Sequence, residues 1–225
     1  MENNIMKRTL LILFGAVAAA WVNVASADFV FNLGTGNSAI SGFTGPYASV
    51  DVHLIDSTHA TITFTSLTNS GNIYLLGDGG SVAVNVNATS WTLGSITGSN
   101  TVPTFTPGPW SDGGAGNEDG FGSFNQTINS FDGYTHTSDQ ISFLLTDTSG
   151  TWADDQHVLI GNSDGHIAAA HIFVAAFPAD PAAGALATGF ATGDPPGNSV
   201  PEPGSLALLG AAFLGGVAVL RRRRS

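Results

Sequence analysis

Apolar and polar residues alternate along much of the chain between residues 28 and 177, with a period of two. The clearest alternation covers residues 29–33, 50–54, 60–65 and 82–93. This pattern is typical of antiparallel strands that have one buried face and one exposed face. We predict further strands at residues 72–76, 121–128, 140–146, 157–160 and 167–177. The last of these is apolar on both faces, which predicts a central strand.

Asp-Gly pairs separate several of these segments, at residues 78–79, 119–120, 132–133 and 164–165. Asp-Gly readily adopts the positive φ angles that hairpin loops require, so the pairs predict a meander or Greek-key arrangement. The same region has no convincing amphipathic helix. We therefore predict an all-β fold for residues 28–177, an antiparallel β-sandwich that is jelly-roll-like.

Residues 178–199 are rich in Ala, Gly, Thr and Pro. This composition predicts a linker, part of which can pack on the domain.

The N-terminal residues have the pattern of a secretory signal peptide. Lys7 and Arg8 precede an uninterrupted apolar segment at residues 10–20, and the small residues Ala25 and Ala27 follow it. A permanent transmembrane helix is the alternative, but the apolar segment is short for one. We expect signal peptidase to cut between Ala27 and Asp28, leaving residues 1–27 as the signal helix.

A second apolar run, residues 205–220, lies near the C-terminus and is followed by Arg221, Arg222, Arg223 and Arg224. Its 16 residues span roughly 24 Å as a helix, against about 30 Å of bilayer hydrocarbon, so it predicts a marginal transmembrane helix. The positive-inside rule places the arginines on the cytoplasmic side. A buried core helix is the alternative, but four consecutive cations fit a globular interior poorly.

The motif Pro201, Glu202 and Pro203 precedes this apolar run, within a C-terminal segment at residues 200–225. Proline restricts its own backbone and that of the preceding residue, so the motif should be extended and accessible. The order of motif, short apolar helix and arginine cluster resembles the PEP-CTERM sorting signal of exported Gram-negative bacterial proteins. The resemblance covers this C-terminal segment only.

That resemblance implies a role for each part of the segment. Pro201, Glu202 and Pro203 would be the recognition motif, residues 205–220 the transmembrane helix, and Arg221 to Arg224 the stop. In the family, a membrane-embedded exosortase, a cysteine transpeptidase-like enzyme, recognises and processes the signal. Such proteins are associated with envelopes that produce exopolysaccharide.

The charge of the exported part differs from that of the whole chain, whose formal net charge is −11. All six Lys and Arg lie in the two terminal segments, while 15 of the 17 Asp and Glu lie between residues 28 and 200. A body without cations predicts no nucleic-acid partner and little affinity for anionic lipid. The chain has no cysteine, which excludes disulfides and thiol chemistry.

Residues 161–165 match Gly-x-Ser-x-Gly around Ser163, the pattern of a nucleophile elbow. That arrangement needs a helix after the serine and an acid and a histidine farther along the chain. Here only His166 and His171 follow, with Asp164 between them and the serine, which is too close to form a triad. We therefore predict a turn.

The acidic loop at residues 112–120 has Asp112, Asn117, Glu118 and Asp119 as oxygen ligands that calcium could use. Asp and Gly also serve turns without metal, and this is the reading that we favour. We assign no cofactor and no metal site.

The remaining candidates are histidines, paired carboxylates and tryptophans. His166 and His171 would face opposite sides of one strand, and His171 is expected to be a hydrogen-bonded core residue. Asp154 and Asp155 are adjacent and would also diverge, which makes them a weak acid/base pair. Trp91, Trp110 and Trp152 could stack on sugars, but we expect them to close the ends of the core.

The sequence therefore predicts an exported envelope or extracellular-matrix protein with no enzymatic activity. Its expected partners are signal peptidase, an exosortase, the inner membrane before processing, and exopolysaccharide. The alternative is a secreted carbohydrate-binding module or hydrolase.

Overall fold

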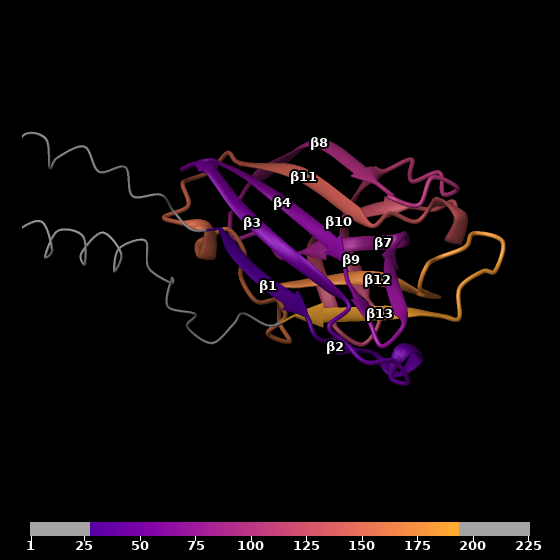
Figure 1. The fold of residues 1–225 in the computed structure, drawn as a ribbon. Coiled ribbons are helices and arrows are strands. Elements are labelled where there is room, and N and C mark those ends of the chain that lie inside the picture. Colours follow the sequence, from indigo (N-terminus) through magenta and orange to yellow (C-terminus); the bar gives the residue numbers. More distant parts are fainter. Residues whose placement is uncertain (1–27, 194–225) are drawn as a thin grey trace, which may run out of the picture.

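The computed structural model describes residues 28–193, which form two antiparallel β-sheets (Figure 1). The five-stranded sheet has the order β1 (Phe29–Leu33), β3 (Ala48–Asp56), β4 (His59–Ser66), β11 (Gln140–Asp147) and β8 (Trp91–Ser99). The eight-stranded sheet has the order β2 (Thr35–Gly36), β13 (Ala187–Gly193), β12 (Ala168–Ala176), β7 (Asp78–Val84), β10 (Gly122–Ser130) and β9 (Ser111–Glu118). Its two remaining strands are β6 (Asn72–Leu76), which pairs with β12, and β5 (Thr68–Asn69), which pairs with β6.

The prediction of an all-β, antiparallel fold is confirmed. The helical elements among residues 28–193 are the short 3-10 helices η2 (Ser38–Ile40), η3 (Tyr134–His136) and η4 (Asp155–His157). In this range, no helix is long and apolar enough to cross a membrane. The expected signal helix, the sorting motif and the helix at residues 205–220 lie outside the described residues, and the jelly-roll description stays a prediction.

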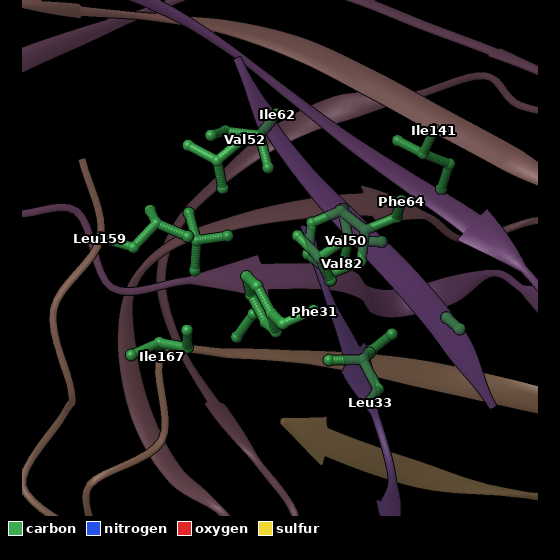
Figure 2. Close-up of a cluster of buried hydrophobic side chains, with 14 of the residues drawn as sticks. Phe31, Leu33, Val50, Val52, Ile62, Phe64, Val82, Ile141, Leu159 and Ile167 are labelled. Carbon is green, nitrogen blue, oxygen red and sulfur yellow. The ribbon is translucent and has the colours of Figure 1, made fainter. Parts of the chain in front are cut away.

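The main core lies between the two sheets and is made by the residues that alternate inward (Figure 2). On the five-stranded sheet, Phe31 pairs with Val50 and Val50 pairs with Phe64, so apolar side chains stand side by side across three strands. Val82 of β7 and Ile172 of β12 belong to the same cluster from the opposite sheet. Burial of these side chains is the main favourable contribution to folding.

The outer face of the eight-stranded sheet is also covered. Two smaller clusters form there, from residues that alternate with those of the main core. One cluster comprises Ile73, Leu75, Phe105, Phe173, Ala175 and Ala179, and the other comprises Ala83, Phe121, Phe124 and Ala169. Strand β12 is therefore buried on both faces, as its sequence predicts.

The domain does not end at residue 177 as expected. Residues 187–193, assigned to the linker from their composition, form β13, which pairs with β12 from Ala187 opposite Val174 to Gly193 opposite Ala168. Small residues suit this strand because the Cβ of any larger residue at Gly193 would lie 2.5 Å from the Asn32 carbonyl oxygen of β1. The linker prediction is corrected accordingly, and the sheet continues to Gly193.

Three other segments also differ from the prediction. The alternation at residues 82–93 is not one strand, because β7 ends at Val84 and β8 begins at Trp91 in the other sheet. Residues 157–160 are not a strand: Asp154 caps η4 by accepting from the backbone N–H groups of Gln156 and His157, and Leu159 makes only an isolated bridge to Val86. The glycine-rich segment expected to be a loop forms β9 and pairs with β10.

Substituting one valine on each face of the five-stranded sheet should show which face is buried in the core, through the change in the free energy of unfolding. Val50 of β3 is 0% exposed and Val30 of β1 is 54% exposed. We expect Val50→Ala to lower the free energy of unfolding by about 2 kcal/mol, because it removes buried methyl groups and leaves a cavity. Val30→Ala should change it by less than about 0.5 kcal/mol. Urea denaturation measures both, and equal effects would contradict the assignment of the core.

Candidate functional site

A polar depression of about 510 Å³ opens at one end of the sandwich. Three segments meet there: residues 85–89 after β7, residues 147–151 at the end of β11, and Asn125 of β10. Its polar lining consists of Asn85, Asn87, Thr89, Asn125, Asp147, Ser149 and Thr151. The lining contains amides and hydroxyls but no basic group.

Side-chain amides hold the floor of the depression in place. Asn125 accepts from the backbone N–H of Val86 at 2.7 Å and donates to the Val86 carbonyl at 3.0 Å. Its side chain therefore makes the two backbone hydrogen bonds that a neighbouring strand would otherwise make. Asn87 donates to the carbonyl of His157 at 2.8 Å, and its own carbonyl accepts from the indole of Trp152 at 2.9 Å. These bonds fix the shape of the depression before any ligand arrives.

Asp147 organises the rim. Its Oδ1 accepts from the backbone N–H groups of Ser149 and Gly150 at 2.8 and 2.9 Å, and from the Ser149 hydroxyl at 2.9 Å. Burial alone would raise the pKa of Asp147, but these hydrogen bonds outweigh it and hold the pKa below its usual value. The carboxylate therefore stays ionised and supports the turn.

The three tryptophans in the described range close the core. Trp152 is buried, and Trp91 and Trp110 are half-buried and pack against the main cluster. The Trp110 indole donates to the Ser138 hydroxyl at 3.2 Å, and the Trp91 indole donates to Gln126 at 3.1 Å. This agrees with the packing role that we favoured, and it leaves no fully exposed ring among them.

Ser163 lies in a turn and is followed by a strand. Asn162 organises this turn, because its Oδ1 accepts from the backbone N–H groups of Asp164 and His166 at 3.0 and 3.1 Å. Strand β12 begins at Ala168, so the helix that a nucleophile elbow needs does not follow Ser163. The predicted turn is confirmed.

The carboxylates of residues 112–120 diverge. Asp112 accepts from the backbone N–H of Gly114 and from the Gln126 amide, both at 2.8 Å. Glu118 is buried, and Asp119 accepts from Asn37 at 3.2 Å. Within residues 28–193, no group of three or more His, Asp or Glu side chains is placed to hold a metal ion. The calcium ligands considered from the sequence do not converge.

Asp154 and Asp155 also point to different partners. Asp154 caps η4 and accepts from His157 at 2.6 Å, whereas Asp155 is buried and accepts from the backbone N–H of Leu54 at 2.5 Å. His171 stacks on Phe190 with ring centroids 4.5 Å apart. Its Nδ1 is buried with no hydrogen-bond partner, while the ring makes a hydrogen bond to the Gly79 backbone, so the expected hydrogen bonding involves one side of the ring only.

The depression was missed from the sequence because its three segments are far apart along the chain. One signal was present: Asn85 and Asn87 occupy the positions that alternate with buried Val84 and Val86. Two amides on the same face at the end of a strand indicate a polar surface. They do not reveal which other segments of the chain complete that surface.

Removing the Asp147 carboxylate should loosen the rim. We expect Asp147→Ala to destabilise the protein by about 2 kcal/mol at pH 7, because three donors lose a charged acceptor. Asp147→Asn should cost less, since it keeps an acceptor oxygen. The lowered pKa of Asp147 means that this stability is present above its usual pKa and is lost as pH falls through the lowered value. Thermal unfolding of the three proteins should therefore converge in strong acid, and a difference that persists there would contradict this role.

Comparison with known proteins identifies only the C-terminal segment. No curated protein and no solved structure matches the chain. Residues 199–224 match the family model of the PEP-CTERM protein-sorting motif. This match contains Pro201, Glu202, Pro203 and the four arginines. The chain thus carries a PEP-CTERM motif at its C-terminus, the signal of a protein that is exported, sorted to the cell surface and processed by an exosortase.

Proposed function

We propose that this chain is a non-enzymatic protein of the cell envelope or extracellular matrix, with a structural or binding role linked to exopolysaccharide. The observation that carries the proposal is the PEP-CTERM match at residues 199–224. In this proposal signal peptidase removes residues 1–27, the helix at residues 205–220 holds the precursor in the inner membrane, and an exosortase then acts at the motif.

The short distance between the domain and the motif supports processing close to the membrane. Strand β13 ends at Gly193, and seven residues, 194–200, separate it from Pro201. A fully extended chain of this length reaches roughly 25 Å. The folded domain therefore stays near the exosortase while the motif is engaged, and it is released outward when the signal is processed.

The environments of the reactive side chains support a role without catalysis. Ser163 lies in a structural turn, and Asp147, Asp154 and Asp155 accept hydrogen bonds from backbone N–H groups. A serine nucleophile requires a base within hydrogen-bond reach. Ser149 donates to the Asp147 carboxylate at 2.9 Å, but the pKa of this carboxyl is held below its usual value, which makes it a weak base. No histidine lines the polar depression.

Changing the sorting motif tests delivery. We expect replacement of Pro201, Glu202 and Pro203 by alanine to leave the precursor unprocessed in the membrane fraction, because the exosortase loses its recognition element. Mass spectrometry of the C-terminus and immunoblots of cell fractions measure this. A matched control replaces Pro195 and Pro196, which lie outside the matched segment, and should be processed normally. Normal processing of the motif variant would contradict the proposal.

A second candidate function is a carbohydrate-binding module, and the polar depression favours it. Amides and hydroxyls pair with sugar hydroxyls, and the acidic, cation-free surface suits a neutral glycan better than an anionic one. In this candidate function the sugar binds in the depression, and not on the Trp110 ring that the sequence suggested. A hydrolase is not favoured, because the carboxylate in the depression, Asp147, accepts from the backbone N–H groups of Ser149 and Gly150 and no second titratable group lines the depression.

Glycan binding can be tested with one variant in the depression and one outside it. If the depression binds neutral polysaccharide, Asn87→Ala should abolish the signal on a glycan array, because its amide lines the site. Trp110→Phe, outside the depression, should keep the signal. Loss with the Trp110 variant alone would move the site to that ring, and an array without signal would remove this candidate while leaving the sorting proposal intact.

A further inference from the structure

Strands β9 and β10 form a hairpin whose tip, residues 118–122, packs against the outer face of the eight-stranded sheet. Phe121 and Phe124 cluster with Ala83 of β7 and Ala169 of β12. These two alanines alternate with residues of the main core, so the cluster lies on the opposite face. The hairpin therefore folds back over its own sheet and covers part of it.

Few polar contacts fasten the tip. Asn37 donates to the carbonyl and to the carboxylate of Asp119 at 3.3 and 3.2 Å. Asn162 donates to the carbonyl of Phe121 at 2.9 Å, and the Phe121 ring stands edge-on to His166 at 5.3 Å. These contacts join Asp119 and Phe121 to the neighbouring loops, and the carboxyl group of Glu118 is enclosed beneath them.

Glu118 is buried between the hairpin and the sheet. It is 1% exposed, and its carboxyl packs directly on Gly80 of β7. A side chain at Gly80 would overlap this carboxyl, and Gly80 has a φ of +62°, which glycine adopts without strain. The Oε2 atom of Glu118 is buried and has no hydrogen-bond partner. A carboxyl that is both enclosed and unpartnered is costly to ionise.

The surroundings offer no cation to offset that cost. Residues 28–193 contain no Lys or Arg. The titratable groups around the tip are Asp78 at the start of β7, Asp119 in the turn, Asp164 beside Gly122, His166, and His171 of β12. Burial lowers the pKa of His171, despite Asp78 and a hydrogen bond to the Gly79 backbone, so this ring favours its neutral form. Burial raises the pKa of Glu118 to about 8.

We propose that Glu118 is a latch for the β9–β10 hairpin: the tip stays on the sheet while this carboxyl is protonated, and ionisation releases the tip and exposes the apolar side chains that meet there. These are Phe121 and Phe124 of the hairpin, and Ala83 and Ala169 of the sheet. The release is local, because the main core lies on the other face of the sheet.

The sign of the pH dependence follows from linkage. In the open hairpin Glu118 meets water and titrates near its ordinary value of 4.5, whereas in the closed hairpin its pKa is about 8. The stabilisation of the closed hairpin by Glu118 is therefore fully present below the open-state pKa of 4.5 and is lost as pH rises through the closed-state pKa of about 8. Between them, the equilibrium constant for opening should rise by up to about tenfold per pH unit, and it should level off above pH 8.

Hydrogen exchange on the exported protein, followed by mass spectrometry from pH 5 to pH 9, tests the latch. After correction for the intrinsic exchange rate, we expect protection of peptides from residues 111–130 to fall with pH by up to about tenfold per unit. Peptides from β3 and β4 should show a much smaller change. Glu118→Gln removes the titration and should make hairpin protection independent of pH.

Asp119→Asn is the matched control, because it removes a carboxyl one residue away while keeping a side-chain oxygen that can accept from Asn37. Whatever its absolute protection, the change of hairpin protection with pH should match that of the wild type. If Glu118→Gln fails to fold, the wild-type and Asp119→Asn profiles still decide between local and global effects. Equal loss of protection in all strands would mean that Glu118 stabilises the whole fold, and it would overturn the latch. A flat wild-type profile in residues 111–130 would overturn it as well.

Discussion

The domain folds without a single Lys or Arg, and this constraint determines how its carboxylates are used. Asp56 accepts from the backbone N–H groups of Thr58 and His59, Asp147 from those of Ser149 and Gly150, and Asp154 from those of Gln156 and His157. Hydrogen bonds to ionised groups are stronger than those between neutral groups. In this way negative charges that have no cationic partner stabilise turns.

The ion pairs in the described range involve histidine and form fully only in acid. Asp28 pairs with His53 at 2.7 Å, and this hydrogen bond raises the pKa of His53. Asp51 lies nearby with a buried Oδ1 that has no partner, and burial together with Asp28 and Asp155 raises the pKa of Asp51. Like Glu118, Asp51 is easier to bury when protonated. Apolar burial on both faces of the larger sheet must therefore provide most of the stability.

Most of the sheet was predictable because alternation is a local signal. Strands β1, β4 and β11 alternate throughout, β3 alternates over its first half, and β12 is apolar on both faces, which its central position explains. Strands β9 and β13 were missed because both are rich in glycine and other small residues, which carry little alternation. Their pairing depends on close approach to other strands: Gly113 and Gly116 of β9 leave room for the Thr127 side chain. That approach is a property of the tertiary structure, so a single segment does not reveal it.

The contrast between local and tertiary signals also applies to the functional residues. The sorting motif is a continuous segment whose order carries the signal, and the sequence alone located Pro201, Glu202 and Pro203 within it. The polar depression combines Asn87, Asn125 and Asp147 from distant parts of the chain, and no local pattern joins them. Glu118 was misjudged for a related reason, because between Asn117 and Asp119 it resembled a solvated ligand. Its burial under the hairpin appears only when β9 folds over β7.

The distribution of charge along the chain fits the proposed route to the cell surface. Lys7, Arg8 and the four C-terminal arginines each flank an apolar run, and the positive-inside rule would keep both clusters on the cytoplasmic side. The residues between the two apolar runs would then lie on the opposite side of the membrane from the cytoplasm. They contain no Lys or Arg that would favour the cytoplasmic side. Removal of both ends would leave a body of strongly negative charge. Mutual repulsion would keep such domains apart in solution, and association with other envelope components would then depend on hydrogen-bonding surfaces such as the depression.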